Sequence, residues 1–202
     1  MNNDSIRKLF LESIEVKKSC IEAGFDSLYK VGADIAKGIK KGNKVMFCGN
    51  GGSAADAQHL VAELLIRLRP KYNRPAIPAL SLAQDSSTIT ACGNDYSFDD
   101  LFSRVLEAIG KKGDFLIVLS TSGNSKNIIN VLNLAKKMGV YTFGFLGCDG
   151  GKAIKLCDSF FLVPSQDTGR IQESHITAGH ALMEYIEDAL LEADFFTLND
   201  GY

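Results

Sequence analysis

Four side chains in two predicted helices could together bind a metal ion. His59 and Glu63 are four residues apart, a spacing that makes them neighbours on one helix face. Gln172 and His180 lie about 80° apart around a later helix, because each residue advances about 100°. Two imidazoles, a carboxylate and an amide oxygen suit Zn²⁺ or a similar divalent ion. The alternative is a surface His59–Glu63 pair and a buried, hydrogen-bonded His180.

Two loops rich in glycine and hydroxyl groups are candidates for binding phosphate. Residues 48–54 read CGNGGSA and follow a predicted strand, and Ser53 stands where it can cap the next helix. Residues 120–125 read STSGNS and follow another predicted strand. Hydroxyls and main-chain N–H groups at a helix start favour an anion. We expect a bound phosphate here; the alternative is a polar turn that only caps a helix.

A nucleotide is a weaker match to the same loops. The first loop fits G-x-G-x-x-A, a variant of the dinucleotide fingerprint. That fingerprint needs an acid about 20 residues downstream, but the nearest acid after the second predicted strand is Asp85, more than thirty residues beyond the loop. The second loop lacks the lysine of a P-loop. A phosphorylated small molecule is therefore favoured.

Strands and helices alternate along the part of the chain that carries these loops. This pattern predicts a three-layer αβα sandwich with a five-stranded parallel sheet, whose ligands bind beyond the carboxyl ends of the strands. The predicted strands are residues 44–49, 78–83, 115–120, 140–147 and 159–164. The predicted helices are residues 6–23, 26–40, 53–68, 86–91, 98–109, 126–138, 151–156 and 171–193.

Composition favours a soluble globular protein. The 202 residues are 46% hydrophobic and 23% charged, as in an ordinary globule, and the net charge of −2 gives no general attraction to nucleic acid. The five cysteines are odd in number and lack C-x-x-C spacing, which suits free thiols in a reducing cytoplasm. No signal peptide or membrane-spanning stretch is evident. We expect a cytoplasmic protein that binds neither membrane nor nucleic acid.

The chain divides into an N-terminal extension and a main domain within one structural unit. Residues 1–42 carry two amphipathic helices that we expect to serve oligomerisation, and residues 43–202 form the α/β domain.

A run of basic residues begins at the end of the predicted helix that carries His59. It either lines the entrance for an anionic substrate or forms a solvated edge. Its members are Arg67, Arg69, Lys71 and Arg74.

Five segments together resemble the sugar-isomerase (SIS) domain family and, within it, the phosphoheptose isomerases. The likeness covers nearly the whole chain, and the combination is far more specific than either loop alone. The segments are GNGGSAADAQHLVAEL (residues 49–64), GNDYSF (93–98), STSGNS (120–125), GCDGG (147–151) and RIQESHITAGH (170–180).

This resemblance implies a flavodoxin-like SIS fold and a homotetramer with active sites at subunit interfaces. The implied activity is that of an aldose–ketose isomerase, an intramolecular oxidoreductase. It would convert sedoheptulose 7-phosphate to D-glycero-D-manno-heptose 7-phosphate, the first step towards nucleotide-activated heptose for lipopolysaccharide or another surface glycan.

The resemblance also assigns roles to residues. Acid–base catalysis maps to Glu63 and His180. One Zn²⁺ per subunit maps to His59, Glu63, Gln172 and His180. Substrate binding maps to Asn50, Gly51, Gly52, Ser53, Glu63, Asn94, Asp95, Ser120, Thr121, Ser122, Ser125 and Gln172.

Two alternatives to this activity come from within the same family. A replication protein that binds the bacterial initiator keeps the Arg-Ile-Gln segment but lacks the acid and the histidine at positions 63 and 180. This chain has both, which favours an enzyme. An isomerase of another phosphosugar is the second alternative. One departure is Gly169, where some phosphoheptose isomerases carry an aspartate; the acids of this chain nearest upstream of that position include Asp167.

Overall fold

Five parallel strands form the central sheet, in the order β2-β1-β3-β4-β5. The computed structural model describes residues 3–83 and 85–196. The first strand lies inside the sheet, the second lies on one side of it, and the later strands follow on the other side. This is the flavodoxin-like order, and it confirms the predicted fold class. The strands are β1 (Val45–Gly49), β2 (Ala79–Ser81), β3 (Phe115–Ser120), β4 (Tyr141–Gly147) and β5 (Ser159–Val163).

The two central strands place the two candidate phosphate loops side by side. β1 and β3 are buried along their whole length, as expected for strands covered by helices on both faces. Their register pairs Gly49 with Leu119. Both strands therefore end at the same edge of the sheet, and the loops that follow them lie next to each other there.

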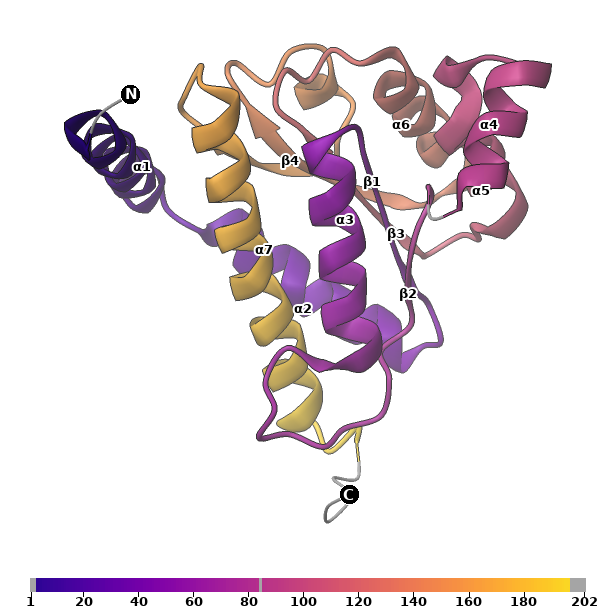
Figure 1. The fold of residues 1–202 in the computed structure, drawn as a ribbon. Coiled ribbons are helices and arrows are strands. Elements are labelled where there is room, and N and C mark those ends of the chain that lie inside the picture. The colour runs from indigo at the N-terminus through magenta and orange to yellow at the C-terminus, as the bar shows by residue number, and fades with distance from the viewer. Residues whose placement is uncertain (1–2, 84, 197–202) are drawn as a thin grey trace.

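Helices cover both faces of the sheet (Figure 1). α2, α3 and α7 pack with one apolar cluster, and α5 and α6 pack with the other. The α-helices are α1 (Asn3–Ala23), α2 (Asp26–Lys40), α3 (Gly52–Ala62), α4 (Ser86–Asp95), α5 (Leu101–Ile109), α6 (Lys126–Met138) and α7 (Thr168–Leu191). Shorter turns are the π-helix η1 (Glu63–Arg67) and the 3₁₀ helices η2 (Phe98–Asp100) and η3 (Ala153–Lys155).

The helix after the glycine loop differs from its prediction at both ends. It begins at Gly52, after Gly51 with a φ of 58°, and no side chain caps it. Ser53 is therefore not the cap; it lies within the first turn and is buried. At the other end the α-helix gives way at Glu63 to the π-helix η1, which sequence periodicity did not predict.

α1 exposes an apolar surface at the edge of the molecule. It leans away from the sheet (Figure 1), and Cys20 is its only buried residue. Its exposed apolar side chains include Phe10 and Ile21. A hollow of about 470 Å³ lies between α1, α2 and α7. Within the described residues, no helix is both long and apolar enough to cross a membrane.

A glycine allows α7 to approach α3 closely, and the two helices run side by side (Figure 1). A Cβ on Gly179 would lie 2.8 Å from both methyl carbons of Leu60. Leu60 is fully buried, so it has little room to move aside.

We predict that Gly179→Ala lowers the free energy of unfolding by about 1–3 kcal/mol, the usual cost of overpacking. This loss should outweigh the gain of roughly 1 kcal/mol that alanine brings to a helix. Gly93→Ala is the matched control, because Gly93 is also helical and a Cβ there meets nothing within 4 Å. In urea denaturation, equal stability of the two variants would contradict the close packing.

His175 is a core residue that should destabilise the folded protein at acidic pH. Its side chain is fully buried on α7, and its ring lies 5.8 Å from that of Phe145. Burial lowers the pKa of His175 to about 4, an effect partly offset by the Leu146 backbone. The unfolded chain therefore takes up a proton on this imidazole near pH 6.5, whereas the folded chain does so only near pH 4.

Acidification from about pH 6.5 towards pH 4 should therefore reduce the free energy of unfolding, by about 3 kcal/mol for this group alone. His175→Gln should show a shallower loss over the same range, whatever its stability at pH 8. Urea denaturation at pH 8, 6 and 5 checks this. Parallel pH profiles for the variant and the wild type would show that His175 does not contribute.

Candidate active site

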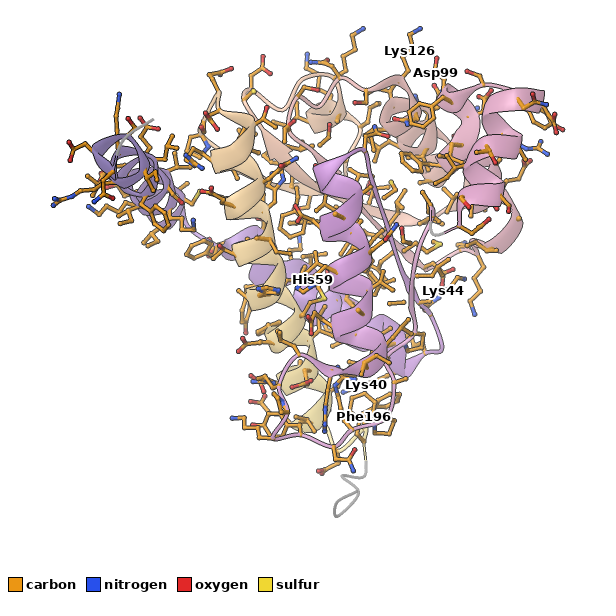
Figure 2. All side chains as sticks on the ribbon, viewed as in Figure 1. Lys40, Lys44, His59, Asp99, Lys126 and Phe196 are labelled. Carbon is orange, nitrogen blue, oxygen red and sulfur yellow. The ribbon has the colours of Figure 1, made fainter. Side chains whose placement is uncertain are left out.

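His59, Glu63 and His180 converge where α3 and η1 face α7. The two Nε2 atoms of His59 and His180 are 2.8 Å apart, and His59 Nε2 lies 3.3 Å from Glu63 Oε1. One ligand atom from each of the three residues lies within 4.8 Å of the others. Figure 2 places His59 between α3 and α7. His59 and Glu63 thus form the expected pair, and His180, which is half-buried, joins them in a single cluster.

The donor set of this cluster fits a divalent metal ion. Two imidazole nitrogens and a carboxylate oxygen are the kind of set that holds zinc at catalytic sites, with a further position left open for water or substrate. The His59 side chain is 47% exposed. A ligand can therefore reach the cluster from outside.

Asp56 is a neighbour of this cluster that sequence reasoning missed. It lies on α3 three residues before His59, so the two share a face. Its Oδ2 is buried and has no hydrogen-bond partner among the residues that the structure describes. Burial raises the pKa of Asp56, and the nearby His59 and His180 lower it. A carboxylate beside metal-binding imidazoles can fix their orientation. The i, i+3 spacing from His59 was the available signal.

Gln172 shares a face of α7 with His180 and lies over the first turn of α3. Its amide packs on Gly52, where an added Cβ would be 2.7 Å from Nε2. Eight residues of helix separate Gln172 from His180, which is about 12 Å along the axis. That both side chains reach one metal ion therefore stays a prediction, because their long side chains would have to span this rise from both ends.

The hydroxyl-rich loop after β3 opens onto the start of α6. Ser120 Oγ accepts a hydrogen bond from the Gly123 N–H, and Ser122 Oγ accepts one from the Asn124 N–H. Ser125 occupies the N-cap position of α6, but its side chain makes no capping hydrogen bond. Its hydroxyl and the first N–H groups of α6 are thus suited to an anion.

The glycine loop is tied to the same place. The amides of Asn50 and Asn127 pair with each other in both directions, at 2.9 Å. This pairing joins the loop after β1 to α6. It also occupies the Asn50 side chain, so any contact of Asn50 with a ligand falls to its main chain or requires this pair to open. The structure thus gathers residues 50–53, residues 120–125 and Gln172 at the carboxyl edge of the sheet.

Asn94 and Asp95 lie apart from both groups within one chain. They are the last two residues of α4, which packs with α5 in the layer on the other side of the sheet from α3 and α7. Both are exposed, and Asn94 Nδ2 donates a hydrogen bond to Asp95 Oδ1. The structure does not bring them to the cluster of their own chain.

Two members of the basic run point inward, to acids of α7. Arg69 donates hydrogen bonds to Glu187 and Asp188, and Arg74 donates to Glu187. Arg74 is 8% exposed. Neither the substrate-entrance prediction nor the solvated-edge prediction holds for Arg74. The Arg69 guanidinium is likewise paired with acids of α7, rather than open to an anionic substrate. The other two members are closer to solvent: Arg67 donates weakly to the Pro70 carbonyl, and Lys71 stacks on Tyr72.

The departure at Gly169 has a structural counterpart two residues earlier. Asp167 occupies the N-cap position of α7, and its Oδ1 accepts a hydrogen bond of 3.0 Å from the Arg170 N–H. The upstream acid of this chain therefore caps the helix that carries Gln172 and His180.

Comparison with known proteins agrees with this geometry. The SIS domain model matches residues 10–147. The phosphoheptose isomerase of Paramagnetospirillum magneticum is 48% identical over 87% of this chain and 89% of that protein. The Aquifex aeolicus phosphoheptose isomerase is 46% identical, over 94% of this chain and 98% of that protein.

Solved structures show the same relationship. A phosphoheptose isomerase from Francisella tularensis superposes with a TM-score of 0.88 at 32% identity, covering 93% of this chain and all of that one. The Neisseria gonorrhoeae phosphoheptose isomerase gives a TM-score of 0.83 at 36% identity, covering 92% of this chain and 98% of that one. The chain belongs to the SIS domain family, in its phosphoheptose isomerase branch.

Proposed function

We propose that this protein converts sedoheptulose 7-phosphate to D-glycero-D-manno-heptose 7-phosphate, as an aldose–ketose isomerase at the start of nucleotide-activated heptose synthesis. The observation that carries the proposal is the meeting of Glu63 and His180 beside His59. Relatives named phosphoheptose isomerase at 46–48% identity support the choice of substrate.

Isomerisation needs one group that removes a proton from C1. It needs another that transfers protons to and from the oxygens on C1 and C2 as the carbonyl moves from C2 to C1. A carboxylate and an imidazole can share this work through an enediolate. We assign the C1 proton to Glu63 and the oxygen protons to His180; the reverse assignment uses the same two groups. Glu63 keeps its basicity if one carboxylate oxygen stays free of metal.

The substrate would be held at its far end by the phosphate loops. The hydroxyls of Ser122 and Ser125 and the first N–H groups of α6 suit the phosphate, and Gln172 lies at the same edge. From Gly52 to His59 is seven residues of α3, about 10 Å along the helix. Fixing the phosphate would orient the reacting carbons of a long sugar towards the other end.

His59, Glu63 and His180 would hold one Zn²⁺ per subunit. When bound, the ion would polarise the substrate carbonyl and stabilise developing negative charge on oxygen. We propose Gln172 as the fourth ligand, through its amide oxygen.

We further propose a cytoplasmic homotetramer whose active sites lie between subunits. The exposed apolar side chains of α1 and the hollow beneath it offer a surface for assembly. In such an assembly Gln172, Asn94 and Asp95 could act on the substrate of a neighbouring subunit, which would reconcile their assigned roles with their distance from their own cluster.

Glu63→Gln should abolish isomerisation while the protein stays folded. The amide keeps the shape of the side chain but cannot accept the C1 proton, so kcat should fall by at least about 10³-fold, within the range for lost acid–base catalysis. Conversion of sedoheptulose 7-phosphate is followed by NMR, with fructose 6-phosphate as the specificity control. Substantial turnover by the variant would reject Glu63 as the base.

Ser122→Ala and Ser125→Ala should mainly raise KM, because they remove hydrogen bonds to the phosphate rather than to the reacting carbons. Each lost hydrogen bond to a charged group costs about 1.5–3 kcal/mol, or roughly a tenfold or greater loss of affinity. Ser86→Ala, at the exposed start of α4, is the control. Unchanged KM in both loop variants would place the phosphate elsewhere.

A further inference from the structure

Arg74 has a buried guanidinium that donates hydrogen bonds to main-chain carbonyls, including that of Glu63. Its side chain is 1% exposed. Nη2 donates to the Glu63 carbonyl at 2.8 Å, and Nη1 donates to the Leu64 carbonyl at 3.0 Å. The carbonyl of Pro75 accepts a third bond, at 3.0 Å from Nη1. Arg74 therefore contacts the backbone of the residue proposed as base and metal ligand.

The carbonyls that Arg74 binds stand at the start of a short π-helix. Glu63 opens this helix, η1, which ends at Arg67. Such π-turns are uncommon and often lie at functional sites. The Leu64 carbonyl also accepts from the Ile77 N–H at 3.0 Å. The segment after η1 thus folds back to cap it.

Arg74 is in turn fixed to α7, the helix that carries His180. Its Nε lies 2.6 Å from Glu187 Oε2, and the Glu187 side chain is 2% exposed. Glu187 follows His180 by seven residues, which puts the two on nearly the same face of α7, about 10 Å apart along the axis. One arginine therefore links the backbone at Glu63 to the helix face that presents His180.

We propose that Arg74 and Glu187 form a positioning pair that sets Glu63 against His180. This inference rests on the function proposed above for Glu63. A buried ion pair gains little stability over apolar side chains of the same size, so its value here is geometric. The planar guanidinium binds these carbonyls and the carboxylate in one fixed geometry, which the compact ammonium of a lysine on its flexible stem does not provide.

Arg69 provides an internal comparison. It shares the same acid, with Nε 2.7 Å from Glu187 Oε1, and it also bonds Asp188. Its other hydrogen bond goes to the Glu184 carbonyl on α7, and none of its hydrogen bonds reaches the Glu63 or Leu64 carbonyl. Arg69→Gln therefore removes a neighbouring ion pair without touching the backbone of η1.

The test compares Arg69→Gln with the double variant Arg74→Met/Glu187→Leu. The double variant removes both partners and so leaves neither member of the pair buried without the other. Arg74→Lys, which keeps the charge next to Glu187, serves as a second variant should the double one fold poorly. Readouts are zinc affinity by chelator competition, the visible spectrum of the Co²⁺-loaded protein, and kcat and KM for sedoheptulose 7-phosphate.

We expect the double variant to fold, to bind zinc about 10–100-fold more weakly, to show an altered Co²⁺ spectrum, and to lose kcat more than KM. Arg74→Lys should shift the same readouts in the same direction. Arg69→Gln should keep the wild-type spectrum and a zinc affinity within about threefold.

Wild-type zinc affinity, spectrum and kcat in a folded Arg74 variant would overturn the proposal. So would an equal loss in Arg69→Gln, because that would show general destabilisation. Failure of the proposed function looks different: the wild type itself would not convert the heptulose phosphate, while the Co²⁺ spectra would still report whether Arg74 positions Glu63.

Discussion

The close packing of α3 on α7 is the constraint on which the site depends. Gly179 removes the side chain that would meet Leu60, and beside this contact His59 and His180 come within hydrogen-bond distance. At one end of the helix pair Gln172 rests on Gly52. At the other end Arg74 joins η1 to Glu187. Three contacts along one helix pair thus hold the helix turn of His59 and Glu63 against His180, more than a hundred residues later in the sequence.

The parallel sheet explains why the two ends of the site differ in character. Its carboxyl edge gathers loops with main-chain N–H groups and hydroxyls, which suit an anion but hold few titratable groups. The side chains proposed as acid, base and metal donors lie further along α3, η1 and α7, where helix periodicity can present them on one face. A ligand with a phosphate at one end and a carbonyl at the other matches this separation.

The fold was largely readable from the sequence, because buried parallel strands give short apolar runs and each run here ends in a glycine, serine or proline signal. α2 and α6 have the predicted bounds. The site was only partly readable. His59 and Glu63 share a helix turn, so spacing could pair them. The π-turn at Glu63 and the inward course of Arg74 depend on tertiary contacts that no local pattern encodes.

The most direct test of the account is isomerisation of sedoheptulose 7-phosphate by the purified, zinc-loaded protein in D₂O, followed by NMR. If Glu63 and His180 move protons through an enediolate, the aldose product should form and carry deuterium at C2, because the proton returned to carbon comes from a group that exchanges with solvent. Two results would contradict the account. One is no conversion by a folded, zinc-loaded protein. The other is a product whose C2 hydrogen comes entirely from C1 of the substrate, with no deuterium.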